Sequence, residues 1–385
     1  MYKRLLGILQ NSRHSYLILG ARGTGKTTWV KQAFPEARYI DLLDQTVYLE
    51  LIASPGRIKQ FFPKDPRQWI IIDEIQKIPM LLNEVHRVME SERRRFILTG
   101  SSARSLRKKG VNLLAGRALH VIAHPLTAIE EGESFNLHTS LQFGQLPAVK
   151  KHDMPKAYLS SYVTTYLREE VLQEGLTRNI QTFHRFLEAA SFSHGTQVEY
   201  ASIARELGID NKTVSNYYDI LEDLLIAHRL PVFTKRAKRR LSHAPKFYLF
   251  DVGIYQTLRP RGPLDSNQEI NGHALEGFVL QELRAVNDYF HLEYEFFFWR
   301  TSSQIEVDFI AYGPCGLYAI EVKSRDRYDP SDLKGLKAFK EDYPQATCYL
   351  FYMGEQERMV DDIQILSCDK VIPQLDKLLS GQKIR

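Results

Sequence analysis

The sequence predicts an α/β protein with three parts in chain order. An apolar strand, a glycine-rich loop and a helix follow one another in residues 16–30, as in parallel sheets that bind nucleotides. Helical patterns on either side of Gly208 predict a helix-turn-helix module in the middle. Charged strand patterns within residues 305–324 predict a second α/β unit at the end. We expect the boundaries near residues 130 and 245.

The composition is that of a soluble globular chain. The 385 residues are 44% hydrophobic and 25% charged, which suits two or three domains. No apolar run approaches the length of a membrane span, and the first residues lack the pattern of a secretory leader. The three cysteines are too widely spaced for a disulfide framework or a zinc site. We therefore expect a cytoplasmic protein without a membrane segment. Its net charge of +5 is too small to indicate a partner.

The glycine-rich loop has the P-loop pattern, with Gly20, Gly25, Lys26 and Thr27 at the required spacing. In such a loop the backbone N–H groups close around phosphate oxygens at the start of a helix. Lys26 is expected to contact the β and γ phosphates of ATP, and Thr27 to hold Mg²⁺. The residues expected to bind ATP are Gly20, Ala21, Arg22, Gly23, Thr24, Gly25, Lys26, Thr27 and Thr28.

A second apolar run, from Trp69 to Ile72, ends in two acids. P-loop ATPases need one carboxylate that orders Mg²⁺ and another that activates water. We assign Asp73 to the metal and Glu74 to the general base.

The next strand ends in hydroxyl residues, and an arginine precedes the strand after it. Ser101 is our candidate for sensing the γ-phosphate and orienting the attacking water, with Thr99 in reserve. Arg117 could act as a catalytic finger in the site of a neighbouring subunit, which would imply a ring-shaped homo-oligomer. The alternative is an ordinary surface arginine.

The segments GARGTGKTT, IIIDEIQKIP, ILTGSS, LLAGR and HPLTAIE together resemble a family of bacterial and archaeal AAA-type ATPases. In that family the ATPase is joined to a C-terminal domain of unknown function, and the resemblance covers nearly the whole chain. It implies a P-loop AAA+ ATPase core over residues 1–130 that binds ATP and Mg²⁺ and hydrolyses ATP. We find no clear helical lid with a sensor arginine after this core.

The middle of the chain is expected to contact DNA. Polar residues early in the second helix are of the types that reach base edges or phosphates: Lys212, Thr213, Ser215 and Asn216. A basic run follows and would suit the wing of a winged-helix module along a phosphate backbone: Lys235, Arg236, Lys238, Arg239, Arg240 and Lys246. A solvated hairpin is the alternative. The preceding tract, 147–180, is interpreted as a linking amphipathic helix.

Two strand patterns, 306–312 and 316–324, form a predicted hairpin. A turn centred between residues 314 and 315 sets Asp308 opposite Glu321, with Lys323 on the same face as Glu321. Opposed like charges destabilise a sheet by up to about 1 kcal/mol, and a divalent cation between them reverses the sign. Carboxylates suit Mg²⁺ or Mn²⁺, and a lysine beside the metal could position water for attack on a phosphodiester.

With Glu276 on a preceding helix, these residues resemble the PD-(D/E)XK nucleases. A later helix and strand complete the αβββαβ order of that fold, although Val307 stands where such sites often have proline. The resemblance implies that Asp308 and Glu321 bind Mg²⁺ or Mn²⁺ and that Glu276 and Lys323 are catalytic.

The sequence therefore favours an ATP-hydrolysing AAA+ protein that binds and cleaves DNA. One alternative is an ATP-controlled switch that binds DNA or protein and whose nuclease-like domain is catalytically silent. Another is a signalling ATPase whose helix-turn-helix packs internally. Absence of salt-sensitive DNA binding would favour this last interpretation.

Overall fold

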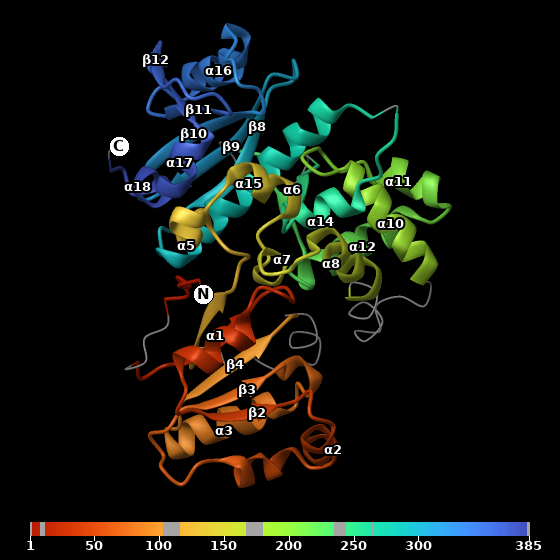
Figure 1. The fold of residues 1–385 in the computed structure, drawn as a ribbon, viewed down its shortest axis with the longest axis vertical. Helices are drawn as coiled ribbons and strands as arrows, with labels where there is room; N and C mark the ends of the chain where they lie inside the picture. The colour runs from red at the N-terminus through yellow and green to blue at the C-terminus, as the bar shows by residue number, and fades with distance from the viewer. Residues whose placement is uncertain are drawn as a thin grey trace.

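The computed structural model describes residues 2–7, 12–102, 116–166, 180–234, 244–263 and 265–382. One sheet, built from the N-terminal part, lies at one end of the long axis of the molecule (Figure 1). A helical middle and a second sheet lie side by side at the other end (Figure 1). Among the described residues, no helix is long and apolar enough to cross a membrane.

The N-terminal sheet has five parallel strands in the order β2-β3-β4-β1-β5, as the sequence predicts for this part. The strands are β1 (Ser15–Leu19), β2 (Arg38–Asp41), β3 (Ile70–Asp73), β4 (Phe96–Gly100) and β5 (Ala118–Ile122). The helices are α1 (Lys26–Ala33), α2 (Gln45–Ala53) and α3 (Leu81–Glu92). Because the strands are parallel, their carboxyl ends meet at one edge, where the phosphate loop and the two acids of β3 come together.

The middle begins with short helices instead of the single helix predicted over 147–180. They are α5 (Ala128–Glu131), α6 (Leu137–Phe143), α7 (Pro147–Lys150), α8 (Pro155–Ser161) and a π-helical turn (Tyr162–Tyr166). The helix prediction was wrong between α7 and α8. Met154 has non-helical backbone angles there, because a residue that precedes proline disfavours the helical region.

The two helices predicted around Gly208 are present. Gly208 has a left-handed φ of 67° and ends α11, and the Asp210 side chain caps the start of α12. The elements are α10 (Ile180–Phe192), α11 (Tyr200–Leu207), α12 (Asn211–Asp223), β6 (Ala227–Leu230), β7 (Lys246–Leu249) and α14 (Val252–Leu258). Strands β6 and β7 form an antiparallel pair, so the domain boundary expected at residue 245 passes through this hairpin.

The C-terminal part is a six-stranded sheet in the order β12-β13-β11-β10-β9-β8, with helices packed against it. Its elements are α15 (Asn267–Tyr289), β8 (Glu295–Arg300), β9 (Glu306–Gly313), β10 (Gly316–Lys323), α16 (Lys334–Asp342), β11 (Thr347–Tyr352), β12 (Arg358–Val360), β13 (Ile363–Ser367), α17 (Cys368–Val371) and α18 (Leu375–Leu379). The predicted succession of a helix, three strands, a helix and a strand is present. Strands β12 and β13 extend the sheet beyond it.

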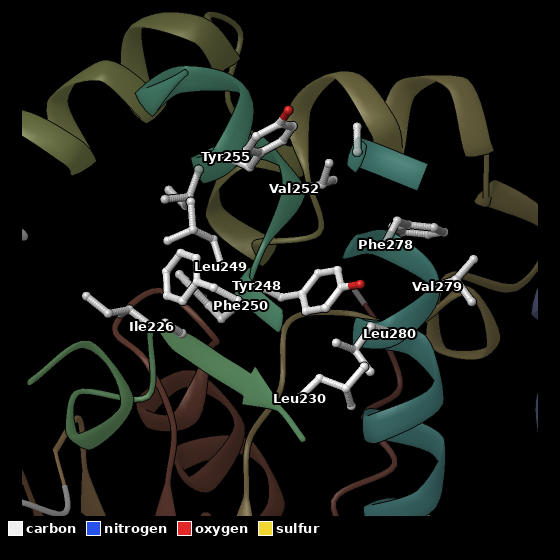
Figure 2. Close-up of a cluster of buried hydrophobic side chains, with 14 of the residues drawn as sticks. Ile226, Leu230, Tyr248, Leu249, Phe250, Val252, Tyr255, Phe278, Val279 and Leu280 are labelled. Carbon is white, nitrogen blue, oxygen red and sulfur yellow. The ribbon is translucent and has the colours of Figure 1, made fainter. Parts of the chain in front are cut away.

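One hydrophobic core joins the middle to the C-terminal part through α15. Figure 2 shows ten labelled side chains of this core: Ile226, Leu230, Tyr248, Leu249, Phe250, Val252, Tyr255, Phe278, Val279 and Leu280. Three of them are consecutive residues of α15, and all three are buried. Neighbouring residues of a helix point in different directions, so α15 is enclosed by both parts. This position makes α15 the structural link between them.

Candidate functional sites

The phosphate loop lies at the carboxyl end of β1 and leads into α1. Gly23 and Gly25 have left-handed φ values of 83° and 86°, which side chains with a Cβ rarely adopt. A Cβ added to Gly20 would lie 2.3 Å from the carbonyl oxygen of Ala123, so only glycine fits there. The ammonium of Lys26, inside the loop, donates to the Gly20 carbonyl at 2.6 Å. The loop therefore has the backbone shape that the motif requires.

Thr27 and Asp73 are adjacent, as the sequence predicts. The Thr27 hydroxyl donates to Oδ2 of Asp73 at 2.8 Å. The hydroxyls of Thr99 and Tyr39 also donate to this carboxylate. Burial, and then the hydrogen bond to Asp73, raise the pKa of Tyr39, so its hydroxyl remains a donor. A hydroxyl and a carboxylate beside the loop are oxygen ligands suited to Mg²⁺.

Glu74 and Ser101 also lie together, connected by a residue that the sequence analysis missed. The Gln76 amide donates to Oε2 of Glu74 and, at 2.8 Å, to Oγ of Ser101. The Ser101 hydroxyl is 3.4 Å from the same Glu74 oxygen. Gln76 is buried in the structure. In the sequence, its position two residues after a pair of acids was the signal that could have identified it. Together these contacts hold Glu74 beside the loop, although its backbone has an unfavourable φ of 61°.

Arg117 lies at the amino ends of the strands, opposite the end that holds the phosphate loop. It precedes β5, whose amino end is remote from the phosphate loop because all five strands are parallel. Its guanidinium forms an exposed ion pair with Glu90. Arg117 therefore has no place in its own chain's nucleotide site.

The middle of the chain covers the phosphate loop, although the sequence showed no clear lid. The Tyr162 hydroxyl donates to the Arg22 carbonyl at 2.9 Å. A Cβ added to Gly25 would lie 3.5 Å from Pro147, which begins α7. The Arg22 guanidinium lies over the ring of Tyr166 with 4.9 Å to its centroid. The start of α7 and the π-helical turn thus occupy the position of a lid.

In the C-terminal part, the hairpin has the predicted register. Ile320 lies opposite Phe309, the last pair of this ladder, and Glu321 and Asp308 are the next residues of the two strands. Asp308 accepts a hydrogen bond from the backbone N–H of Val322 at 2.9 Å, which fixes its carboxylate at the pairing edge of β10. The Lys323 ammonium is 2.5 Å from Oε1 of Glu321. We call these two acids, Lys323 and Glu276 of α15 the acid–lysine site.

Electrostatics at the acid–lysine site reflect an excess of buried negative charge. Burial, and then the charge of Asp308, raise the pKa of both Glu276 and Glu321. Burial alone would lower the pKa of Lys323, but Asp308 and Glu321 raise it, so its ammonium persists. Oε2 of Glu321 is buried without a hydrogen-bond partner within the described part of the chain. The site is therefore short of positive charge.

Lys246 was expected in a wing and is found among these acids instead. The residue is only 3% exposed. Its ammonium is 2.5 Å from Glu306, 3.5 Å from Asp308 and 3.9 Å from Glu276. Burial alone would lower the pKa of Lys246, but neighbouring negative groups raise it overall. The alternation of β7 also points Tyr248 toward α15 (Figure 2). Its hydroxyl donates to Glu276 at 3.4 Å.

The donor atoms of the acid–lysine site suit a hard divalent cation. Among the described residues, no group of three or more His, Cys, Asp or Glu side chains could hold a metal ion. Mg²⁺ commonly needs only one or two carboxylates, with water and substrate phosphate completing its coordination. Asp308 and Glu321 supply two carboxylates. Oε2 of Glu321 has no hydrogen-bond partner among the described residues and is a potential metal ligand. Asp308 and Glu321 are therefore the residues that would hold such a cation.

The acid–lysine site opens into a cavity of about 400 Å³. Glu276 and Lys323 line it, together with Glu269 and Arg325. A substrate phosphate could therefore reach these side chains from solvent.

The residues expected to contact DNA are only partly available for it. Lys212 and Asn216 of α12 are exposed, and Ser215 is partly exposed. The Thr213 hydroxyl donates to Asp210 at 2.7 Å and thus takes part in capping the helix. The remaining candidates, Lys235, Arg236, Lys238, Arg239 and Arg240, lie outside the described residues.

Comparison with known families divides the chain into three matched segments. An AAA domain matches residues 12–131, so the N-terminal part is a P-loop ATPase domain. A domain of unknown function, DUF8612, matches residues 135–265, and another, DUF4143, matches residues 271–371.

Relatives with curated sequences exist in several bacteria. Uncharacterized proteins of Mycobacterium tuberculosis and Mycobacterium bovis are each 27% identical over 322 residues, covering 81% of this chain and 71% of the relative. An uncharacterized protein of Haemophilus influenzae is 22% identical over 204 residues, covering 48% of this chain and 51% of the relative.

A search of solved structures also found two weak matches. The Aeropyrum pernix ORC1 protein in complex with DNA is 14% identical, with a TM-score of 0.26, over 64% of this chain and 86% of that one. Protein VC1899 from Vibrio cholerae is 12% identical, with a TM-score of 0.23, over 95% of this chain and 97% of that one. These TM-scores are too low to bear on the fold or activity of this chain.

Proposed function

We propose that this chain, which begins with an AAA domain, hydrolyses ATP, binds DNA and cleaves DNA at the acid–lysine site. One observation carries the proposal for cleavage. Glu276 of α15 and Lys323 of β10 line a cavity that is open to solvent, Lys323 contacts Glu321, and Lys246 contacts both Glu276 and Asp308.

ATP hydrolysis is supported by the contacts at the phosphate loop. Thr27 and Asp73 would hold Mg²⁺, which supplies positive charge to the β and γ phosphates. Lys26 stabilises negative charge that develops on the γ-phosphate. Glu74, held by Gln76 and Ser101, accepts a proton from the water whose oxygen attacks the γ-phosphorus.

Phosphodiester cleavage would use the acid–lysine site in a similar way. Asp308 and Glu321 would hold Mg²⁺ or Mn²⁺, which supplies charge stabilisation to the scissile phosphate. The Lys323 ammonium donates a hydrogen bond to the attacking water or to a phosphate oxygen. Glu276 lines the cavity, so in its ionised form its carboxylate is placed to accept the proton from that water.

DNA binding is supported by the middle of the chain. The pair α11 and α12, followed by the β6–β7 hairpin, has the order of elements of a winged helix. Lys212 and Asn216 are exposed early in α12, where a recognition helix contacts DNA. Such binding would weaken steeply with added salt, because phosphate contacts release counterions.

A second candidate function is an ATP-controlled binding switch with a silent C-terminal site. The observation that favours it is Lys246, whose buried ammonium already neutralises part of the acidic cluster. In that case the charges of Glu306, Asp308 and Lys246 would serve the fold and not catalysis.

The deciding experiment is cleavage of supercoiled and linear DNA with Mg²⁺ or Mn²⁺, with and without ATP. We expect nicking by the wild type, its loss in Lys323→Ala, and its retention in Lys337→Ala, which removes an exposed lysine. Loss in Lys26→Ala as well would indicate that ATP controls cleavage. A wild-type protein that hydrolyses ATP but cuts no DNA would support the binding switch.

A further inference from the structure

A second cavity, of about 560 Å³, adjoins the acid–lysine site. One wall comes from α6, α8 and α14 of the middle, and the other from α15 and the segments that follow β10 and β11. Figure 1 shows α6 and α14 beside α15. The cavity therefore lies where the middle meets the C-terminal part.

The charge of this second cavity favours an anion. Three of its lining residues carry basic side chains: His138, Lys156 and Arg261. All three are exposed, so their side chains reach solvent at the rim. None of the described residues that line the cavity is acidic. A ligand with a phosphate group would have complementary charge.

The interior of the second cavity suits a flat, partly polar group. Phe143, Leu159 and Met353 supply apolar surface on which a base can lie. The Gln256 amide N–H donates to the Leu141 carbonyl at 3.1 Å. Oε1 of Gln256 is buried and has no hydrogen-bond partner among the described residues. A nucleobase has a flat face that can lie on these apolar side chains and N–H groups that can donate to Oε1 of Gln256.

The two cavities are adjacent. Ser324, which directly follows Lys323, lines both of them. On α15, Asn271 lines the second cavity and Gly272 lines the first. A strand with one phosphate at Lys323 would therefore place a neighbouring nucleotide in the second cavity.

We infer that the second cavity holds one unpaired nucleotide of the strand being cut, so that the substrate is single-stranded or frayed DNA. Its volume is in the range of pockets that enclose one small molecule, and a duplex cannot enter a space of that size. This inference rests on the proposed cleavage of DNA at the acid–lysine site and names the form of its substrate.

The test compares the binding of a labelled single strand and of the matching duplex, in EDTA so that no cleavage occurs. Lys156→Ala/Arg261→Ala removes two rim charges. Lys151→Ala/Arg358→Ala removes two charges that do not line the cavity. We expect the first variant to bind the single strand about tenfold more weakly, with a salt slope smaller by about 1.4 for two lost phosphate contacts. Duplex binding and ATPase activity should stay unchanged, as should the control variant.

A second measurement identifies the contact directly. Photo-crosslinking with an iodouracil-substituted single strand should label the peptide that contains Phe143 or the one that contains Met353. Unchanged single-strand binding by Lys156→Ala/Arg261→Ala, or equal losses for duplex and single strand, would overturn the inference. If the wild type still cleaves DNA in that case, the proposed function stands. A wild type that binds no DNA would overturn both.

Discussion

Arg4 and Tyr289 are hydrogen-bonded at 2.9 Å, although they lie at distant points of the chain. The same guanidinium donates to the carbonyl of Thr24 in the phosphate loop, also at 2.9 Å. Tyr289 is the last residue of α15, the helix that carries Glu276. The ATP site and the acid–lysine site are thus connected through one arginine and one helix.

A second contact fixes α15 against α5, at the end of the segment that matches the AAA domain. The backbone N–H of Ala128 donates to both carboxylate oxygens of Glu282, at 3.0 and 3.1 Å. From residue 276 to residue 289 the helix rises by about 20 Å, which is the span over which a shift of the loop could be transmitted.

We predict that Tyr289→Phe weakens the effect of ATP on DNA cleavage. The variant loses a hydroxyl that accepts from Arg4 and from the backbone of His124, at a cost of ~1–3 kcal/mol in stability. ATPase activity should remain, while stimulation of nicking by ATP should fall. Tyr312→Phe, at an exposed tyrosine, is the control. Full stimulation in a stably folded Tyr289→Phe protein would rule out this connection.

Glu74→Gln should retain ATP binding and lose hydrolysis. The amide cannot accept a proton from the attacking water, so the rate should fall roughly 10²–10⁴-fold. Phosphate release and nucleotide binding, measured separately, check this result. Glu133→Gln on an exposed turn should behave as wild type. Hydrolysis at the wild-type rate by Glu74→Gln would assign the base to another residue.

Lys246→Met should lower the thermal unfolding midpoint strongly. It leaves Glu306 and Asp308 without their buried counter-charge, and breaking a buried pair costs about 3–5 kcal/mol. We expect Mn²⁺ to restore part of the loss, because a divalent cation can replace the ammonium. Thermal melts with and without Mn²⁺ measure this, with the exposed-face variant Lys337→Met as control. No recovery with Mn²⁺ would argue against a metal at this site.

The stability of the protein should fall as the pH rises from about 4 to about 6, because of the buried carboxyl of Asp251. Burial raises the pKa of this carboxyl to about 6 from an ordinary value of 3.8. In that window the folded state binds more protons than the unfolded state, so raising the pH favours unfolding by ~3 kcal/mol at most. In Asp251→Asn the midpoint should vary less with pH over this window. An unchanged pH dependence in Asp251→Asn would refute this assignment.

Local patterns predicted the features that depend on short stretches of chain. The position of the turn and the two-residue period of a strand were sufficient to predict the register of the hairpin, in which Asp308 and Glu321 adjoin the Phe309–Ile320 pair. The P-loop pattern and the strand ending in two acids assigned Thr27 and Asp73 to the same Mg²⁺, and the two side chains are hydrogen-bonded. In each case the register or the motif constrains the backbone directly, and the side chains follow.

Features that depend on contact between the parts of the chain were not predictable in this way. Lys246 looked like one more member of a basic run, because nothing in its neighbourhood shows that β7 packs against α15. Tyr162 lies over the phosphate loop and belongs to a π-helical turn. The sequence had predicted one continuous helix there, which has no such turn. Both positions depend on how separate elements pack.

By itself, the sequence determined the parallel sheet with its phosphate loop and the hairpin with its opposed acids. Both features depend on short stretches of sequence: the alternation and turn of a hairpin, and the glycines of a loop. Only the tertiary structure decided that Lys246 enters the acidic cluster, that Arg4 joins the phosphate loop to α15, and that a second cavity adjoins Lys323. These depend on the burial of apolar surface between distant segments, which is set by the whole chain and not by any short stretch of it.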